Sequence, residues 1–203
     1  MKEHYLAWKL TMAAYGIRIR AEDYYPLEGM GPHELAALFI QEHPSLGPKL
    51  GEIVQKKKQC YVDNINLKFY PDVKRLVADL KKTDVRMGIV TAGHLDQLTQ
   101  STPATFLGQF NALVTGDEFK RGKPYPDPYL KGAEKLNLKP EECIAVENAP
   151  LGVTSAKKAG IYCMAICSTV EPRALSEADE VIPSFRDLRH SPKIRKIFKN
   201  ARI

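Results

Sequence analysis

The chain has 203 residues, of which 44% are hydrophobic and 27% charged, a balance typical of a soluble globular protein. That length suffices for one large domain or for a core with a small insert. The sequence contains no run of roughly 18 or more apolar residues, which argues against a membrane-spanning helix and a membrane partner. The four cysteines lack metal-type spacing, and we expect a reducing, cytoplasmic location.

The net charge of +6 comes from the C-terminal segment, because residues 186–203 hold seven Lys or Arg against one Asp. Such a segment is either a solvated helix or a polyanion-binding tail. Ile194, Ile197 and Phe198 recur at the spacing of one helix face. We therefore favour a helix docked on the protein, and predict no nucleic-acid partner.

Residues 1–67 carry only helical patterns. Helices are predicted over residues 5–13, 31–42 and 46–64. The first pattern stops at Gly16, and Pro32 lies in the first turn of the second helix. We expect the lysine run 56–58 to lie on a solvated face of the third helix. The segment is interpreted as an N-terminal helical insert or cap domain.

Residues 68–203 alternate between helix and strand patterns. Apolar runs bounded by turn residues predict strands at 86–91, 111–115, 143–147, 162–167 and 180–182. Helical patterns lie at 72–82, 94–101, 127–137 and 151–159. Strands that are apolar on both faces and alternate with helices indicate a parallel sheet covered on both sides. The sequence predicts a doubly wound, Rossmann-like α/β core domain.

Side chains suited to phosphate chemistry follow three of these strands. In a doubly wound sheet, function lies beyond the carboxyl ends of the strands. The turn Thr91-Ala92-Gly93 follows the first strand, and its hydroxyl and N–H groups could hold a phosphate oxygen, although an ordinary helix-capping turn looks the same. Lys123 lies in Gly-Lys-Pro-x-Pro-Asp-x-Tyr, a rigid setting for a cation aimed at phosphate, whereas an isolated lysine would be a surface residue.

An acid and an amide, Glu147 and Asn148, end the strand at 143–147. Carboxylate and amide oxygens suit Mg²⁺, although an acid in a Pro-Gly turn can also be purely structural. The three signals together are more specific than any one of them, because parallel strands bring all of them to one edge of the sheet.

This order of motifs resembles the haloacid dehalogenase (HAD) superfamily, in the subfamily with an early helical cap. The resemblance covers essentially the whole chain, and the segment His4-Tyr-x-Ala-Trp8 is similar to the start of the family's cap. It implies that Thr91 binds the phosphoryl group, that Lys123 neutralises charge around it, and that Glu147 and Asn148 serve Mg²⁺. The implied mechanism uses two aspartates: one attacks phosphorus, and the other protonates the leaving oxygen and then activates water.

The chain departs from the family pattern in two places. Asn148 stands where an acid is common, so we expect weaker Mg²⁺ binding. No Asp-x-Asp, the family's first motif, occurs anywhere in the sequence. In the family that motif ends the central strand, so the strands 86–91 and 143–147 should have unpaired inner edges. We expect that Met1 is not the natural start; the alternatives are a truncated pseudoenzyme, or replacement of the strand by repacking or a partner.

The expected substrate is a small phosphorylated metabolite. The chain resembles β-phosphoglucomutases and small sugar-phosphate phosphatases, and the resemblance places His4 near the cap hinge and implies that it contacts the substrate. Glu28 and Pro32 stand where the mutase carries a substrate-gripping lysine and arginine. We therefore favour a phosphatase over a mutase, with non-catalytic binding of a phosphometabolite as the alternative function. The sequence does not define the oligomeric state.

Overall fold

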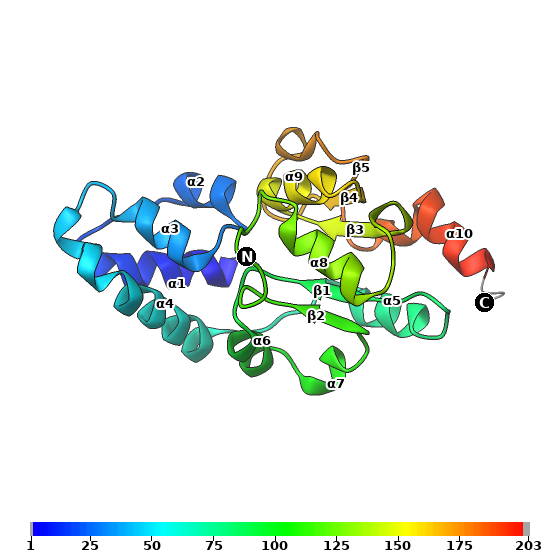
Figure 1. Ribbon diagram of the computed structural model, residues 1–203, viewed down its shortest axis with the longest axis horizontal. Coiled ribbons are helices and arrows are strands. Elements are labelled where there is room, and N and C mark those ends of the chain that lie inside the picture. Colours follow the sequence, from blue (N-terminus) through cyan, green and yellow to red (C-terminus); the bar gives the residue numbers. More distant parts are fainter. Residues whose placement is uncertain (1, 201–203) are drawn as a thin grey trace.

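The computed structural model describes residues 2–200, and all structural statements refer to this part of the chain. Helices α1 to α4 gather at one end of the molecule, the strands lie in the middle, and α10 lies at the opposite end (Figure 1). The helical and the α/β parts of the sequence are therefore also separate in space.

The helical part consists of α1 (Lys2–Ala13), α2 (Ala21–Tyr24), α3 (Pro32–Phe39) and α4 (Leu50–Asn64), with two 3₁₀ turns, η1 (Tyr25–Leu27) and η2 (Pro44–Lys49). Its helices bury one apolar cluster, which includes Trp8, Met12, Leu35 and Ile53. α1 and α4 pack along each other and form the base of this unit (Figure 1).

Two details of the helical part differ from the sequence prediction. The third helix begins at Leu50 rather than near residue 46, because the preceding segment, with Gly47 and Pro48, forms a 3₁₀ turn. The prediction that the lysine run is solvated is wrong for Lys57, which is only 5% exposed. Lys57 lies one turn after Ile53 and therefore shares the buried face of α4.

The α/β part contains five strands, β1 (Gly88–Val90), β2 (Ala112–Val114), β3 (Ile144–Glu147), β4 (Tyr162–Ile166) and β5 (Glu180–Ile182). Between and around them lie α5 (Val73–Leu80), α6 (Leu95–Ser101), α7 (Ala104–Leu107), α8 (Asp127–Lys135), α9 (Pro150–Lys158) and α10 (Pro192–Asn200), with short 3₁₀ turns η3 (Pro140–Glu142), η4 (Pro172–Leu175) and η5 (Asp187–His190). Every strand pair is parallel.

Helices cover both faces of the sheet, as predicted for a doubly wound fold. Cys163 and Ala165 of β4 pack with residues of α8 and α9 on one face. Met164 and Ile166, which alternate with them, pack on the other face against Leu76 of α5 and against α10. The α/β fold class and its parallel topology are therefore confirmed.

The sheet is interrupted in its middle. β1 pairs only with β2, and β3, β4 and β5 form a separate three-stranded sheet. A cavity of about 390 Å³ lies between the two sheets and is lined by Gly88–Val90, by Ile144–Asn148 and by residues of α8. We call this cavity the slot. The expected gap between the strands at 86–91 and 143–147 is present.

The basic C-terminal segment forms α10, as predicted. Ile194 is buried against the core, and Ile197 and Phe198 pack partly against the same cluster. The four basic residues of α10 are exposed: Lys193, Arg195, Lys196 and Lys199. Among the described residues, we find no helix with the length and apolar character needed to cross a bilayer.

Candidate active site

One cavity of about 320 Å³ gathers the residues that the sequence singled out. The α/β part contributes Thr91, Ala92, Gly93, Lys123, Glu147 and Asn148 to its walls, and the helical part contributes His4. The topology explains the convergence, because both sheets are parallel, and the turn after β1 and the end of β3 both border this cavity. We call this the cleft.

The Lys123 ammonium and the Glu147 carboxylate form an ion pair inside the fold, and both side chains are more than nine-tenths buried. The Tyr129 hydroxyl of α8 donates a second hydrogen bond, of 2.6 Å, to the same carboxylate oxygen. Burial alone would raise the pKa of Glu147, but Lys123, Tyr129 and the Asn148 N–H outweigh it and hold the pKa below its ordinary value. Glu147 is therefore an anion with its oxygens already engaged.

The start of α9 packs directly on the Glu147 side chain. A Cβ atom at Gly152 would lie 2.2 Å from Cδ of Glu147, a distance that no side chain tolerates. Gly152 thus allows the helix to approach the carboxylate. On the other side, Gly29 of the helical part has a φ of +97°, and its Cβ position lies 3.5 Å from the Lys123 Cδ. The ion pair is enclosed by α9 and by the Glu28-Gly29 turn.

The turn after β1 is held by backbone contacts. The Gly93 N–H donates a 3.1 Å hydrogen bond to the Thr91 hydroxyl, whose own proton stays available for a ligand oxygen. The Gly116 N–H donates to the Gly93 carbonyl at 2.9 Å and ties the turn to the loop after β2. The hydroxyl of Thr91 is thereby fixed at the wall of the cleft, where the sequence prediction placed it.

The described residues do not form a magnesium site by themselves. Lys123, Tyr129 and the Asn148 N–H occupy the Glu147 carboxylate, and the Asn148 amide donates to the Ser168 hydroxyl at 2.9 Å. Within residues 2–200, no three His, Cys, Asp or Glu side chains are grouped as a metal centre requires. Mg²⁺ needs octahedral oxygen ligands, usually with one or two carboxylates free to bind it. We therefore derive no chemical step through a metal ion.

The helical part adds two buried charged groups to the cleft, Lys57 and Glu28. The Lys57 Nζ lies 3.0 Å from Nδ1 of His4, and about 5 Å from the Tyr61 ring centre. Burial lowers the pKa of Lys57 to about 8, and burial and Lys57 hold the pKa of His4 well below its usual range, so the neutral ring accepts the hydrogen bond. The sequence motifs do not single out Lys57 as a site residue, although its spacing of four residues from Ile53 places it on the buried face of α4.

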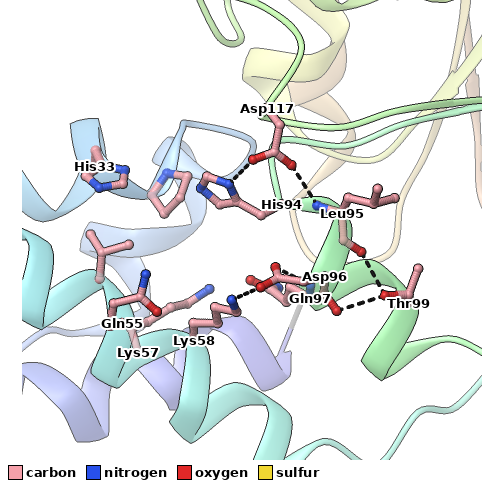
Figure 2. Close-up of a pocket in the computed structure, with 12 residues that line it drawn as sticks. His33, Gln55, Lys57, Lys58, His94, Leu95, Asp96, Gln97, Thr99 and Asp117 are labelled. Carbon is pink, nitrogen blue, oxygen red and sulfur yellow. Dashed lines mark hydrogen bonds and ion pairs between the residues drawn. The ribbon is translucent and has the colours of Figure 1, made fainter.

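A second, larger cavity of about 560 Å³ adjoins the cleft and shares Pro32, Lys57 and Gln97 with it. Figure 2 shows its walls: the ring of His94 lies between His33 and Asp117, and Lys58 of α4 reaches Asp96 at the start of α6. The Lys58–Asp96 ion pair connects the helical part to the α/β part. Thr91, Lys123 and Glu147 line the smaller cleft and do not line this cavity, so we place the chemistry in the cleft.

A model of the haloacid dehalogenase-like hydrolase family matches residues 5–166. Hexitol phosphatase A of Escherichia coli (strain K12) is 36% identical over 118 residues, which cover 58% of this chain and 55% of that protein. Validoxylamine A 7'-phosphate phosphatase of Streptomyces hygroscopicus subsp. limoneus is 35% identical over 115 residues, 56% of this chain and 54% of that protein. The chain thus spans about half the length of these curated relatives.

Solved structures show the same fold. The β-phosphoglucomutase of Clostridium difficile superposes with a TM-score of 0.82 at 21% identity, covering 98% of this chain and 91% of that one. A CbbY variant of Rhodobacter sphaeroides, in complex with xylulose-(1,5)bisphosphate, has a TM-score of 0.80 at 25% identity, covering 92% and 89%. The predicted helical cap on a Rossmann-like core is therefore confirmed.

Proposed function

Because the chain belongs to the haloacid dehalogenase-like hydrolase family, we propose that its cleft binds a small phosphorylated metabolite of the sugar-phosphate type for phosphate-ester hydrolysis. Two relatives whose names describe phosphatases of a hexitol and of validoxylamine 7'-phosphate support this substrate class. The Thr91 hydroxyl would donate to a phosphoryl oxygen, and the fixed ammonium of Lys123 would compensate the charge that develops there.

One observation carries the proposal for the nucleophile: Lys123, Glu147 and Asn148 line both the slot and the cleft. An extended segment in the slot, parallel to β1 and β3, would complete the sheet and end beside Lys123. A carboxylate at its carboxyl end would then face a phosphoryl group held by Thr91. The sequence itself contains no Asp-x-Asp, so the attacking carboxylate of an aspartyl-phosphate mechanism has to come with such a strand.

Magnesium dependence, which the family resemblance implies, stays a prediction. A Mg²⁺ ion bound in the cleft would neutralise negative charge on the phosphoryl group. Carboxylates on a strand in the slot would supply oxygen ligands that Glu147 and Asn148 do not provide alone. Three further points also stay predictions: the domain limits of 1–67 and 68–203, a cytoplasmic location and the absence of a nucleic-acid partner.

Binding without turnover is the second candidate function, and the missing Asp-x-Asp favours it for the 203-residue chain alone. Groups that hold substrate and transition state equally give no acceleration. A mutase is less well supported, because Glu28 and Pro32 offer no cation for a second phosphate.

The test compares three proteins: the 203-residue chain, a fusion that adds an apolar strand ending in Asp-x-Asp before Lys2, and the same fusion with Asn-x-Asn. Each is assayed with Mg²⁺ on hexitol phosphates, hexose phosphates and a chromogenic phosphate ester. We expect turnover only with the Asp-x-Asp strand. Equal turnover by the unextended chain, or no turnover by a well-folded Asp-x-Asp fusion, would contradict the proposal.

A further inference from the structure

The cleft contains one buried charged group whose role is not explained by packing. Glu28 is only 7% exposed, and among residues 2–200 its Oε2 atom has no hydrogen-bond partner. A buried carboxylate oxygen without a donor costs free energy, so such groups in folded proteins normally serve a purpose. The second carboxylate of the cleft, Glu147, is in contrast fully engaged by Lys123 and Tyr129.

The backbone fixes Glu28 in the wall of the cleft that the helical part provides. Its N–H donates to the Tyr25 carbonyl at 3.3 Å, which closes the turn η1. The next residue, Gly29, has a left-handed φ of +97° and lies against the Lys123 side chain and the first residues of α9. Glu28 therefore lines the same cavity as Thr91 and Lys123, from the helical side.

We propose that Glu28 is a specificity-determining residue, which accepts a hydrogen bond from a hydroxyl or ammonium group on the non-phosphorylated end of the substrate and disfavours a second phosphate there. The inference rests on the proposed phosphate-binding function of the cleft. A carboxylate accepts hydrogen bonds from hydroxyls and ammonium groups, whereas a second phosphate brings like charge into a water-poor cavity. The favoured ligand class is thus a polyol or amino-sugar monophosphate.

Charge in the cleft supports this assignment. Lys57 is a cation on the helical side of the cleft that acts on Glu28, but His4 already accepts its hydrogen bond. Burial raises the pKa of Glu28 to about 7, with a further contribution from the like charge of Glu147. A substrate ammonium or hydroxyl that reaches Oε2 would relieve this unfavourable burial, so its binding should depend on Glu28.

The test measures binding by calorimetry, with the 203-residue chain, a Glu28→Gln variant and a matched Glu34→Gln control. Glu34 is an exposed acid on α3 outside the cleft. The probes are inorganic phosphate, glucitol 6-phosphate, glucosamine 6-phosphate and fructose 1,6-bisphosphate. Every affinity is expressed relative to that of inorganic phosphate for the same variant, which removes any uniform effect on the phosphate site.

We expect Glu28→Gln to weaken relative binding of the two monophosphates by about tenfold or more, the usual scale for losing a hydrogen bond to a charged group. A larger loss for glucosamine 6-phosphate would identify the ammonium as the preferred donor, and a larger loss for glucitol 6-phosphate the hydroxyls. Relative binding of the bisphosphate should increase, and Glu34→Gln should change nothing.

Relative affinities that are unchanged in a folded Glu28→Gln variant would overturn the role of Glu28 alone. Failure of inorganic phosphate to bind the unaltered chain would instead contradict the proposed phosphate site. Thermal unfolding of each variant confirms that it is folded at the assay temperature.

Discussion

Lys123 lies in the loop before α8 and Glu147 is the last residue of β3, yet they pair in the fold with both charges buried. The pair lies where the slot meets the cleft. It therefore has a structural role in addition to any role in phosphate binding, and the two can be separated by experiment.

Replacing Lys123 by Met should leave the Glu147 carboxylate buried without its cation. We expect the free energy of unfolding to fall by about 3–5 kcal/mol, the usual cost of breaking a buried pair from one side. The double variant Lys123→Met/Glu147→Gln should regain most of that stability, because no charge remains buried, yet should still fail to bind phosphate. Urea unfolding at neutral pH and phosphate titration measure the two effects; a double variant that binds phosphate normally would exclude Lys123 as the phosphate cation.

Gly152→Ala should disturb the same pair from the side of α9. The new Cβ would overlap the Glu147 carboxylate, so either the helix or the side chain has to move. We expect a loss of about 1–3 kcal/mol, typical of overpacking a buried site. Gly51→Ala in α4, where a Cβ meets open space, is the matched control and should be neutral or slightly stabilising. Equal effects of the two substitutions in thermal unfolding would contradict this packing.

Glu28 should make stability depend on pH in a defined window. The pKa of Glu28 in the folded protein is about 7, above the ordinary value of 4.5. The contribution of Glu28 to the free energy of unfolding is therefore fully present below about pH 4.5 and is lost as the pH rises through 7. The Glu28→Gln variant does not undergo this loss. At pH 8 its free energy of unfolding should therefore exceed that of the unaltered chain by on the order of 3 kcal/mol. Lys57, Glu147 and Glu3 also act on Glu28, so the variant is compared with the unaltered chain at each pH. A difference in stability that stays constant from pH 4.5 to 8 would argue against a buried Glu28.

Removing residues 190–203 should lower stability without affecting the cleft. Burial of Ile194, and partial burial of Ile197 and Phe198, account for a predicted loss of about 2–5 kcal/mol. Phosphate binding should be retained. Fluorescence anisotropy with duplex DNA tests the other interpretation of this basic segment: tight, salt-sensitive binding that disappears with the truncation would reveal a polyanion site.

The pattern of the sequence predicted where the strands lie, because apolar runs bounded by turn residues define short buried parallel strands. It also predicted that Thr91, Lys123 and Glu147 share one cavity, since the carboxyl ends of parallel strands meet at one edge. The sequence did not predict the short helices α2 and α7, whose few residues carry no periodic signal.

The position of a charged side chain follows less directly from a local pattern than the position of an apolar one, and Lys57 is the example. The run Lys56 to Lys58 was interpreted as solvated because lysines usually are, but the face that contains Ile53 carries Lys57 into the interior. The role of Glu147 in binding Mg²⁺ stays a prediction; in the fold its carboxylate is engaged by Lys123 and Tyr129. Which cation an acid meets depends on side chains far apart in the chain, and one sequence does not encode that choice in a local pattern.

The interrupted sheet also bears on how the molecule behaves in concentrated solution. Open strand edges are templates on which a second chain can add its own strands and start aggregation. In this fold the open edges of β1 and β3 face each other across the slot, and α8 forms part of its wall. A single extended segment in the slot could pair with both edges and would remove two such templates at once. The outer edges, at β2 and β5, would then be the remaining places where a strand of another copy could add.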